Sequence, residues 1–312
     1  MISILFGGNY KVFDGILLCL MSMTKHCNET LNIYILTADV SELNKDYLPL
    51  NENQIKILDK VIKKKNPNNK IKLITLGKDF NEWILNSSNK LNTYTPFAFL
   101  RLFADQIEDL PKKIIYLDTD IMINGNISEL NSVDISNHEM AIVKDRYGHI
   151  FIRPKYFNSG MLLMNMKKIK ETKLLEKVRN FCSTKKMAFP DQSALNKFCK
   201  HKIYLPRKFN EQGKIKPNTV VHHFSKKFRL LPFFHTLNIK PWQIDAVQKK
   251  YKCHAYDDIY DEYKQIINGL YLWWVYANHK WTLFMMSIKN QVNFIRLTFL
   301  CHYWHFTTLM LV

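Results

Sequence analysis

The chain has 312 residues, of which 47% are hydrophobic and 13% aromatic. This composition excludes an intrinsically disordered protein and suffices for one enlarged α/β domain, alone or with an appendage. Lys and Arg number 45 against 27 Asp and Glu, a net charge of +18, so we expect an anionic partner: nucleic acid, nucleotide phosphates or an acidic membrane surface.

The first part of the chain predicts alternating strands and helices. Residues 2–6 form an expected strand that ends in a turn at residues 7–10. Apolar residues then recur at helical spacing over 12–25, and residues 31–36 predict a second strand. A β-α-β order with about thirty residues per unit is typical of a parallel, nucleotide-binding sheet.

The next predicted elements are a helix, a strand and a second helix, and the second helix contains a charged residue, Arg101. A helix is expected over 41–48, a strand over 71–76 and another helix over 97–107. The basic, Asn-rich stretch 60–70 is interpreted as a solvated helix end and loop. Arg101 falls inside the apolar helix, where an unpaired charge is costly, so we expect it to have an acidic partner.

An apolar run over 113–123 carries two carboxylates one residue apart, Asp118 and Asp120. The run predicts a buried strand at the edge of the sheet where α/β folds bind ligands. If the chain stays extended, the i, i+2 spacing puts both carboxylates on one face, and oxygen ligands suit Mg²⁺ or Mn²⁺. A polar loop that happens to contain two acids is the alternative.

The second half of the chain repeats these signals with further polar residues. We expect a strand over 139–143 that leads into Asp145, an apolar segment over 156–165, and helices over 171–183 and from 191 onward. Asp191 and Gln192 in a first helical turn are also what ordinary helix capping uses.

Residues 219–224 predict a buried strand that ends in His222 and His223. A strand-end histidine far along the chain from a two-Asp strand suits the third ligand of a mixed oxygen and nitrogen metal site. A histidine that is simply satisfied within the core is the alternative interpretation.

The composition changes after residue 256, which divides the chain into 1–256 and 257–312. Residues 269–312 are rich in Trp, Tyr, Phe and Leu with basic residues between them, which predicts a helical tail that contacts an anionic membrane surface. A packed helical subdomain is the alternative. Three polar residues disfavour a membrane span over 292–312: Arg296, His302 and His305.

The spacing of the cysteines and the composition of the N-terminal stretch indicate the cellular compartment. The six cysteines are scattered without a Cys-x-x-Cys pair, which favours reduced thiols. No basic residue precedes the first apolar stretch and Asp14 interrupts it, unlike a signal peptide. We therefore expect a cytoplasmic protein.

The motifs in their order resemble the family 8 glycosyltransferases, in particular the bacterial enzymes that add galactose or glucose to lipopolysaccharide. The resemblance covers about residues 2–245. The motifs that carry it are Asn9-Tyr10, Arg101, Asp118-Thr119-Asp120, the run from Phe157 to Asn165, Asp191-Gln192, a strand ending in His, and Lys240-Pro241-Trp242.

The resemblance implies an α/β fold of the GT-A type, with a mixed, mostly parallel central sheet flanked by helices and followed by the basic, aromatic helical tail. It implies Mn²⁺ or Mg²⁺ as cofactor and a UDP-sugar as donor. The implied metal ligands are Asp118, Asp120 and His223, with His222 as the fallback. The other implied roles are uridine contacts for Asn9 and Tyr10, a diphosphate contact for Lys240, sugar contacts for Arg101, Asn158, Asp191 and Gln192, and an acceptor contact for Asp145.

The implied reaction is retaining transfer of a hexose to a saccharide or lipid-linked saccharide, such as the lipopolysaccharide or lipooligosaccharide core, at the inner face of the cell membrane. Gln192 is an amide where a covalent mechanism needs a carboxylate, so front-face return and double displacement both stay open. Gly8 and Ser193 stand where the family often has acidic residues, which leaves the donor sugar open.

Two other functions are compatible with parts of the pattern. A haloacid-dehalogenase-like phosphatase also has a strand-end Asp-x-Asp that binds Mg²⁺, but it usually has Thr or Val at the position of Met122 and places the motif near the N-terminus. A non-catalytic basic protein would use the +18 charge to bind nucleic acid or membrane. Because the sequence contains no nucleic-acid-binding module, we expect no nucleic-acid partner.

Overall fold

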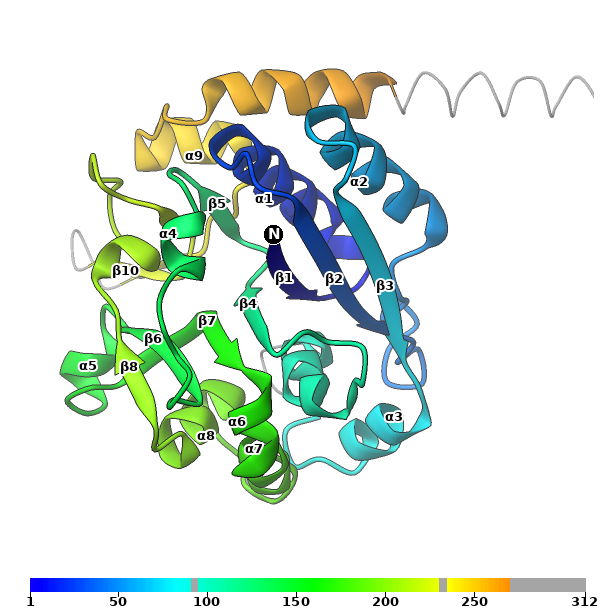
Figure 1. Cartoon of the computed structure of the whole chain (residues 1–312), viewed down its shortest axis with the longest axis vertical. Helices are drawn as coiled ribbons and strands as arrows, with labels where there is room; N and C mark the ends of the chain where they lie inside the picture. Colours follow the sequence, from blue (N-terminus) through cyan, green and yellow to red (C-terminus); the bar gives the residue numbers. More distant parts are fainter. Residues whose placement is uncertain (91–94, 230–234, 270–312) are drawn as a thin grey trace, which may run out of the picture. The chain divides into compact units, whose positions relative to one another are not determined.

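The computed structural model describes residues 1–90, 95–229 and 235–269 (Figure 1). The chain divides into two compact units, Met1–Tyr256 and Asp257–Val312. In the second unit, residues 257–269 are helical. The membrane-contacting tail, its alternative span and Cys301 fall on residues outside the described part, so they stay predictions. Within the described part, no helix combines the length and hydropathy that crossing a membrane requires.

A seven-stranded sheet forms the centre of the first unit, in the order β3-β2-β1-β4-β7-β6-β8. Its strands are β1 (Ile2–Gly7), β2 (Leu31–Ala38), β3 (Lys70–Leu76), β4 (Lys113–Leu117), β6 (Met140–Lys144), β7 (Phe157–Asn165) and β8 (Lys202–Tyr204). All neighbouring pairs are parallel except β4–β7 and β6–β7. The expected mixed, mostly parallel sheet is confirmed.

Among the described residues, two short antiparallel ladders lie outside this sheet. β5 (Ile121–Ile123) pairs with β9 (Val221–His223), and β10 (Lys227–Arg229) pairs with β11 (His235–Leu237). The predicted single strand over 113–123 is therefore wrong. The chain leaves the central sheet after β4 and joins a second sheet as β5, so that residues 118–120 form the link between the two.

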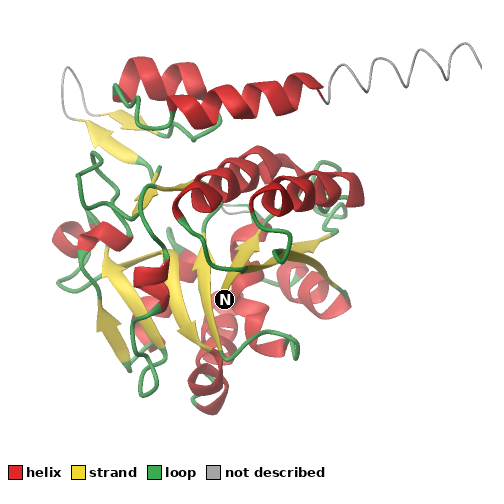
Figure 2. Ribbon diagram, turned by 45° about the horizontal axis from the view of Figure 1, so that its top comes forward, coloured by secondary structure: helices red, strands yellow, loops and turns green. Residues whose placement is uncertain are grey.

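Helices cover both faces of the central sheet (Figure 2). Their bounds are α1 (Phe13–His26), α2 (Glu52–Lys65), α3 (Lys78–Leu85), α4 (Ser128–Asn131), α5 (Gly148–Phe151), α6 (Met166–Glu171), α7 (Leu174–Thr184), α8 (Pro190–Phe198) and α9 (Ile244–Tyr251), with 3₁₀ turns η1 (Tyr10–Val12), η2 (Pro96–Gln106) and η3 (Arg207–Phe209). α1 and α2 lie on one face, and η2, α7 and α8 share a core with the other. Leu5 of β1, Val178 and Leu195 are buried in that core.

The helix expected over 41–48 is wrong, because local polar contacts fold that segment into turns. The Ser41 amide donates to the side chain of Asp39 at 3.0 Å instead of starting a helix. The helix of this region is α2, where the side chains of Asn51 and Gln54 each accept from the other residue's backbone amide. This capping box fixes the true helix start.

Other elements agree with the sequence apart from their ends. The predicted helix over 12–25 is α1, and the helix expected over 97–107 is the 3₁₀ segment η2. The helix expected over 171–183 is α7, which begins at Leu174 after the separate short helix α6, and the one expected from 191 is α8, with Pro190 in its first turn. The solvated loop after α2 is confirmed except for Asn69, which is buried and ties the loop to β2.

Candidate active site

The β5–β9 ladder brings the predicted metal ligands together. Residues 118–120 link β4 to β5. His223 pairs with Ile121 across the antiparallel ladder, and the Phe224 amide donates to the carbonyl of Asp120 at 2.9 Å. This register places His223 beside both carboxylates, although they lie far apart in the chain.

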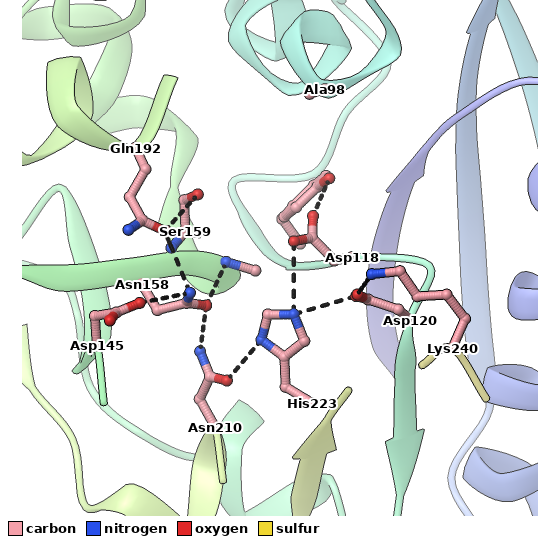
Figure 3. A network of polar contacts seen from close by, with 12 residues as sticks. Ala98, Asp118, Asp120, Asp145, Asn158, Ser159, Gln192, Asn210, His223 and Lys240 are labelled. Atoms are coloured by element: carbon pink, nitrogen blue, oxygen red, sulfur yellow. Dashed lines mark hydrogen bonds and ion pairs between the residues drawn. The ribbon is translucent and has the colours of Figure 1, made fainter. Parts of the chain in front are cut away.

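One oxygen of each carboxylate faces the imidazole of His223 (Figure 3). Nε2 of His223 lies 3.1 Å from Oδ1 of Asp120 and 3.9 Å from Oδ2 of Asp118. Ligand atoms of the three residues all lie within 4.8 Å of one another. Groups at this spacing can share one divalent cation, and the oxygen-rich set suits Mn²⁺ or Mg²⁺.

The other oxygen of each carboxylate is held by a donor from the protein. Oδ1 of Asp118 accepts from the Tyr116 hydroxyl at 2.8 Å and lies 2.9 Å from Nη2 of Arg101. Oδ2 of Asp120 accepts from Nζ of Lys240 at 2.5 Å. Oδ1 of Asp120 is buried and accepts no well-formed hydrogen bond from any described residue. A cation would satisfy this oxygen, so the donor set fits the implied metal.

Gly160 in β7 has no side chain, and the side chains of His223 and Asp118 occupy the space that one would fill. A Cβ at this position would lie 2.3 Å from Cε1 of His223 and 2.7 Å from Oδ2 of Asp118. Both distances are far below van der Waals contact. The cluster therefore requires glycine at position 160.

Gly160→Ala is expected to weaken Mn²⁺ binding by about 10-fold or more, because the new methyl group displaces His223 and Asp118. Overpacking should also lower the free energy of unfolding by about 1–3 kcal/mol. Titration of Mn²⁺ followed by its electron paramagnetic resonance signal measures the first effect, and urea unfolding measures the second. Gly77→Ala is the control, since a Cβ there meets nothing within 4 Å. Equal Mn²⁺ affinity of both variants would contradict the expectation.

Charges around the cluster keep Asp120 ionised. Burial by itself raises the pKa of Asp120, but the charges of Lys240 and His223 outweigh burial and hold that pKa below its ordinary range. Burial lowers the pKa of Lys240 and of His223, while the Asp120 carboxylate raises both, and both end above their ordinary values. The carboxylate is thus ready as a metal ligand at neutral pH.

Arg101 has the acidic partner that the sequence predicts. Its Nη2 lies 2.9 Å from Asp118 and its Nε lies 3.7 Å from Oδ2 of Asp191. Burial lowers the pKa of Arg101, but the charges around it raise that pKa above its ordinary value; burial raises the pKa of Asp191. The guanidinium stacks 4.2 Å from the Tyr116 ring centre and donates to the carbonyl of Ser159 at 2.6 Å.

A second group of predicted residues is joined by side-chain hydrogen bonds (Figure 3). Nδ2 of Asn158 donates to Oδ2 of Asp145 at 3.0 Å and to Oε1 of Gln192 at 3.2 Å. The same Gln192 oxygen accepts from the backbone amide of Ser159 at 3.1 Å. Residues from the ends of β6, β7 and α8 thereby form one polar surface beside the cluster of Asp118, Asp120 and His223.

His222, the fallback ligand, lies outside the cluster. Its Nδ1 lies 3.2 Å from the Tyr256 hydroxyl and its Nε2 lies 3.2 Å from the carbonyl of Gly213. Burial, with help from the charge of Lys227, lowers its pKa to about 3. His222 is therefore a neutral, satisfied core residue, and the geometry favours His223 as the ligand.

Asn9 and Tyr10 lie at the end of β1, outside the hydrogen-bonded network of the other predicted residues in the described part of the chain. Asn9 is buried, and the carbonyl of Tyr10 accepts from Gln54 at 3.0 Å. The position of a Cβ on Gly8 is 3.8 Å from the Thr119 methyl group. The turn thus borders the link that carries the two carboxylates.

Three residues of the site were not predicted. Tyr116 precedes Asp118 by two positions, so strand alternation places both on one side, and this signal was present in the sequence. Ser159 acts through its backbone amide and carbonyl and also through its hydroxyl, which donates to Oδ2 of Asp191 at 3.3 Å. The backbone contacts leave no signal in the sequence. Asn210 bonds both His223 and Asn158 from a separate loop, and only the fold shows that contact.

The family model of Glycosyl transferase family 8 matches residues 1–246 of the chain. The chain is 30% identical over 175 residues to lipopolysaccharide 1,2-glucosyltransferase of Escherichia coli K12, covering 49% of this chain and 51% of that protein. It is 30% identical over 193 residues to a probable glycosyl transferase Gly of Streptococcus gordonii, covering 59% and 24%. The chain spans about half or less of these curated relatives.

Solved structures show the same fold. The galactosyltransferase LgtC, in complex with donor and acceptor sugar analogues, matches with a TM-score of 0.59 at 16% identity over 86% of this chain and 96% of that chain. The glycosyltransferase GlyE of Streptococcus pneumoniae matches with a TM-score of 0.55 at 18% identity over 85% and 64%. The GT-A fold expected from the sequence is confirmed.

Proposed function

Because the chain belongs to glycosyltransferase family 8, we propose that it transfers a hexose, galactose or glucose, from a UDP-sugar to a saccharide acceptor with retention of configuration. The observation that carries the proposal is the convergence of Asp118, Asp120 and His223 beside two cationic side chains, Arg101 and Lys240. Because the chain belongs to this family, we prefer glycosyl transfer to the two other functions considered, the haloacid-dehalogenase-like phosphatase and the non-catalytic basic protein.

The metal cluster and Lys240 suit the diphosphate of the donor. Cleavage of the sugar from the diphosphate develops negative charge on the leaving group. A cation bound by Asp118, Asp120 and His223 would neutralise that charge. Lys240 is paired with Asp120, and its side chain is 27% exposed, so it can also donate to a phosphate oxygen. Asn9 and Tyr10 would contact the uridine, with Tyr10 stacking on uracil.

The polar surface beside the cluster suits the transferred sugar. Arg101, Asn158, Asp191 and Gln192 are the residues that we place around it. Oε1 of Gln192 already accepts from Asn158 and from the amide of Ser159, so its lone pairs are occupied. We therefore favour front-face return, in which the acceptor attacks the anomeric carbon on the face that the diphosphate leaves, over attack by the Gln192 amide.

Asp145 is the residue that we place at the acceptor. Its Oδ1 accepts from the amides of Tyr147 and Gly148, at 3.0 and 2.6 Å, which fixes the orientation of the carboxylate. The relative in E. coli is named for lipopolysaccharide, and this supports a lipopolysaccharide or lipooligosaccharide core as acceptor. We place the enzyme in the cytoplasm at the inner membrane face, with the tail as its proposed membrane contact.

Calorimetric titration of UDP with and without Mn²⁺ tests the proposal, because the diphosphate should bind tighter when the metal is present. A hydrolysis screen of UDP-galactose, UDP-glucose and their N-acetyl forms then identifies the donor. We expect one hexose donor to be hydrolysed fastest, in a metal-dependent manner. UDP affinity that ignores Mn²⁺, together with no hydrolysis of any donor, would instead indicate a basic binding protein.

A further inference from the structure

Asn210 connects the proposed metal site to the sugar-binding surface. It follows η3, and its side chain is fully buried. Oδ1 of Asn210 lies 3.1 Å from Nδ1 of His223, and its Nδ2 donates to Oδ1 of Asn158 at 3.0 Å (Figure 3). The side chain therefore bridges a proposed metal ligand and a proposed sugar contact.

Two partners of Asn158, the Gly160 amide and the Asp145 carboxylate, determine which atom donates in each hydrogen bond of this bridge. The backbone amide of Gly160 can only donate, and it points at Oδ1 of Asn158 at 2.9 Å. Oδ2 of Asp145, a carboxylate oxygen, accepts from Nδ2 of Asn158 at 3.0 Å. If the Asn158 amide were flipped, its NH₂ group would face the Gly160 amide, which is also a donor. Its oxygen would face the Asp145 carboxylate, which is also an acceptor. The orientation of Asn158 is therefore determined by two independent partners.

The orientation of Asn158 determines that of Asn210, and with it the proton on His223. Because Oδ1 of Asn158 accepts, Asn210 must turn its NH₂ group toward it and its own oxygen toward the imidazole. An amide oxygen cannot donate, so Nδ1 of His223 carries a hydrogen. In a neutral imidazole the lone pair then lies on Nε2, the nitrogen that faces Asp118 and Asp120.

We infer that Asn210 is a positioning residue that holds neutral His223 as its Nδ1–H tautomer and so keeps Nε2 available to a divalent cation. The inference rests on the proposed role of His223 as a metal ligand. Metal-bound histidines generally donate their second ring N–H to a fixed acceptor, and loss of that acceptor costs about 10–100-fold in metal affinity. Here the acceptor is an amide whose direction is set through Asn158 by Gly160 and Asp145.

The tautomer is read directly from the wild-type protein. Long-range ¹H–¹⁵N spectra of histidine-labelled, metal-free protein distinguish Nδ1–H from Nε2–H rings. They are recorded at rising pH until the His223 ring is neutral, because the Asp120 carboxylate raises the pKa of His223 above its ordinary value. The His223 signals are assigned by their loss in His223→Gln. We expect the Nδ1–H form. An Nε2–H ring at position 223 would overturn the inference without any change at Asn210.

Variants at position 210 test the role of the acceptor. Asn210→Ala should bind Mn²⁺ about 10–100-fold more weakly and show a mixture of tautomers. Asn210→Asp should retain the Nδ1–H form, because a carboxylate still accepts from Nδ1, although it no longer donates to Oδ1 of Asn158. Asn69→Ala is the matched control: Asn69 is also a buried bridge, accepting from Leu31 at 2.8 Å and donating to Ile62 at 2.9 Å. It should lose stability but keep Mn²⁺ affinity.

The outcomes separate the inference from the proposed function. If Asn210→Ala binds Mn²⁺ as tightly as Asn69→Ala and keeps a single Nδ1–H ring, Asn210 only fills the core and the inference is wrong. If the wild type binds no Mn²⁺, or His223→Gln binds it undiminished, the metal site itself fails, and the inference fails with it. Should Asn210→Ala not fold, the wild-type and Asn210→Asp spectra still decide the tautomer.

Discussion

Asp120→Asn is expected to reduce metal-dependent turnover of the UDP-sugar by about 10³-fold, the scale on which loss of a preorganised electrostatic group acts. The substitution removes a carboxylate that pairs with both His223 and Lys240. The amide keeps the size of the side chain but not its charge, so Mn²⁺ affinity should fall as well. Initial rates of donor hydrolysis over a range of Mn²⁺ concentrations measure both effects.

Asp109→Asn is the matched control for this prediction. Asp109 also pairs with a lysine, Lys72, but on the protein surface, where an ion pair contributes little. This variant should keep wild-type turnover and Mn²⁺ affinity. Circular dichroism of both variants shows whether the fold is retained. Undiminished turnover by a folded Asp120→Asn protein would remove Asp120 from the metal site.

Arg101→Met is expected to lower the free energy of unfolding by about 3–5 kcal/mol, because it leaves two buried or half-buried carboxylates, Asp118 and Asp191, without their cation. Asp118 also loses one of the two groups that hold its Oδ1, with only the Tyr116 hydroxyl left, so its orientation toward the metal position is weakened. We therefore expect Mn²⁺ affinity and turnover to fall together with stability. Denaturant unfolding, Mn²⁺ titration and donor hydrolysis measure the three effects.

Arg179→Met separates general destabilisation from damage to the site. Arg179 is likewise buried: its Nη1 lies 2.5 Å from Asp105, and its guanidinium stacks 5.0 Å from the Phe103 ring centre. This variant should lose comparable stability and keep Mn²⁺ affinity. If both variants bind Mn²⁺ equally well under conditions in which both are folded, Arg101 has a structural role alone.

The sequence predicted the elements whose signals are local. Short apolar segments located β1, β2 and β3, and the apolar run that ends at Asp118 located β4. The helix over 41–48 was wrong because the Ser41 amide is held by the Asp39 side chain in a turn, while the capping box of Asn51 and Gln54 starts α2 at Glu52. Propensity alone does not rank two possible helix starts, whereas the reciprocal hydrogen bonds of a capping box do.

The site required long-range pairing that local patterns do not contain. The sequence supplied the residue types of Asp118, Asp120 and His223, and the family resemblance supplied their grouping. Nothing local indicated that β7 would run antiparallel to both neighbours, or that β5 would leave the central sheet to pair with β9. Asn210 was missed for the same reason, since its contacts with Asn158 and His223 exist only after these strands meet.

The short β5–β9 ladder has a consequence for folding as well as for chemistry. It pairs three residues of each strand, and one of them is His223. Asp118 and Asp120 belong to the link that leaves β4. A cation held by all three residues would act as a cross-link between the central sheet and this small ladder, and its binding free energy would add to the stability of the folded state. The metal concentration would then affect the stability of the folded protein as well as the rate of its reaction.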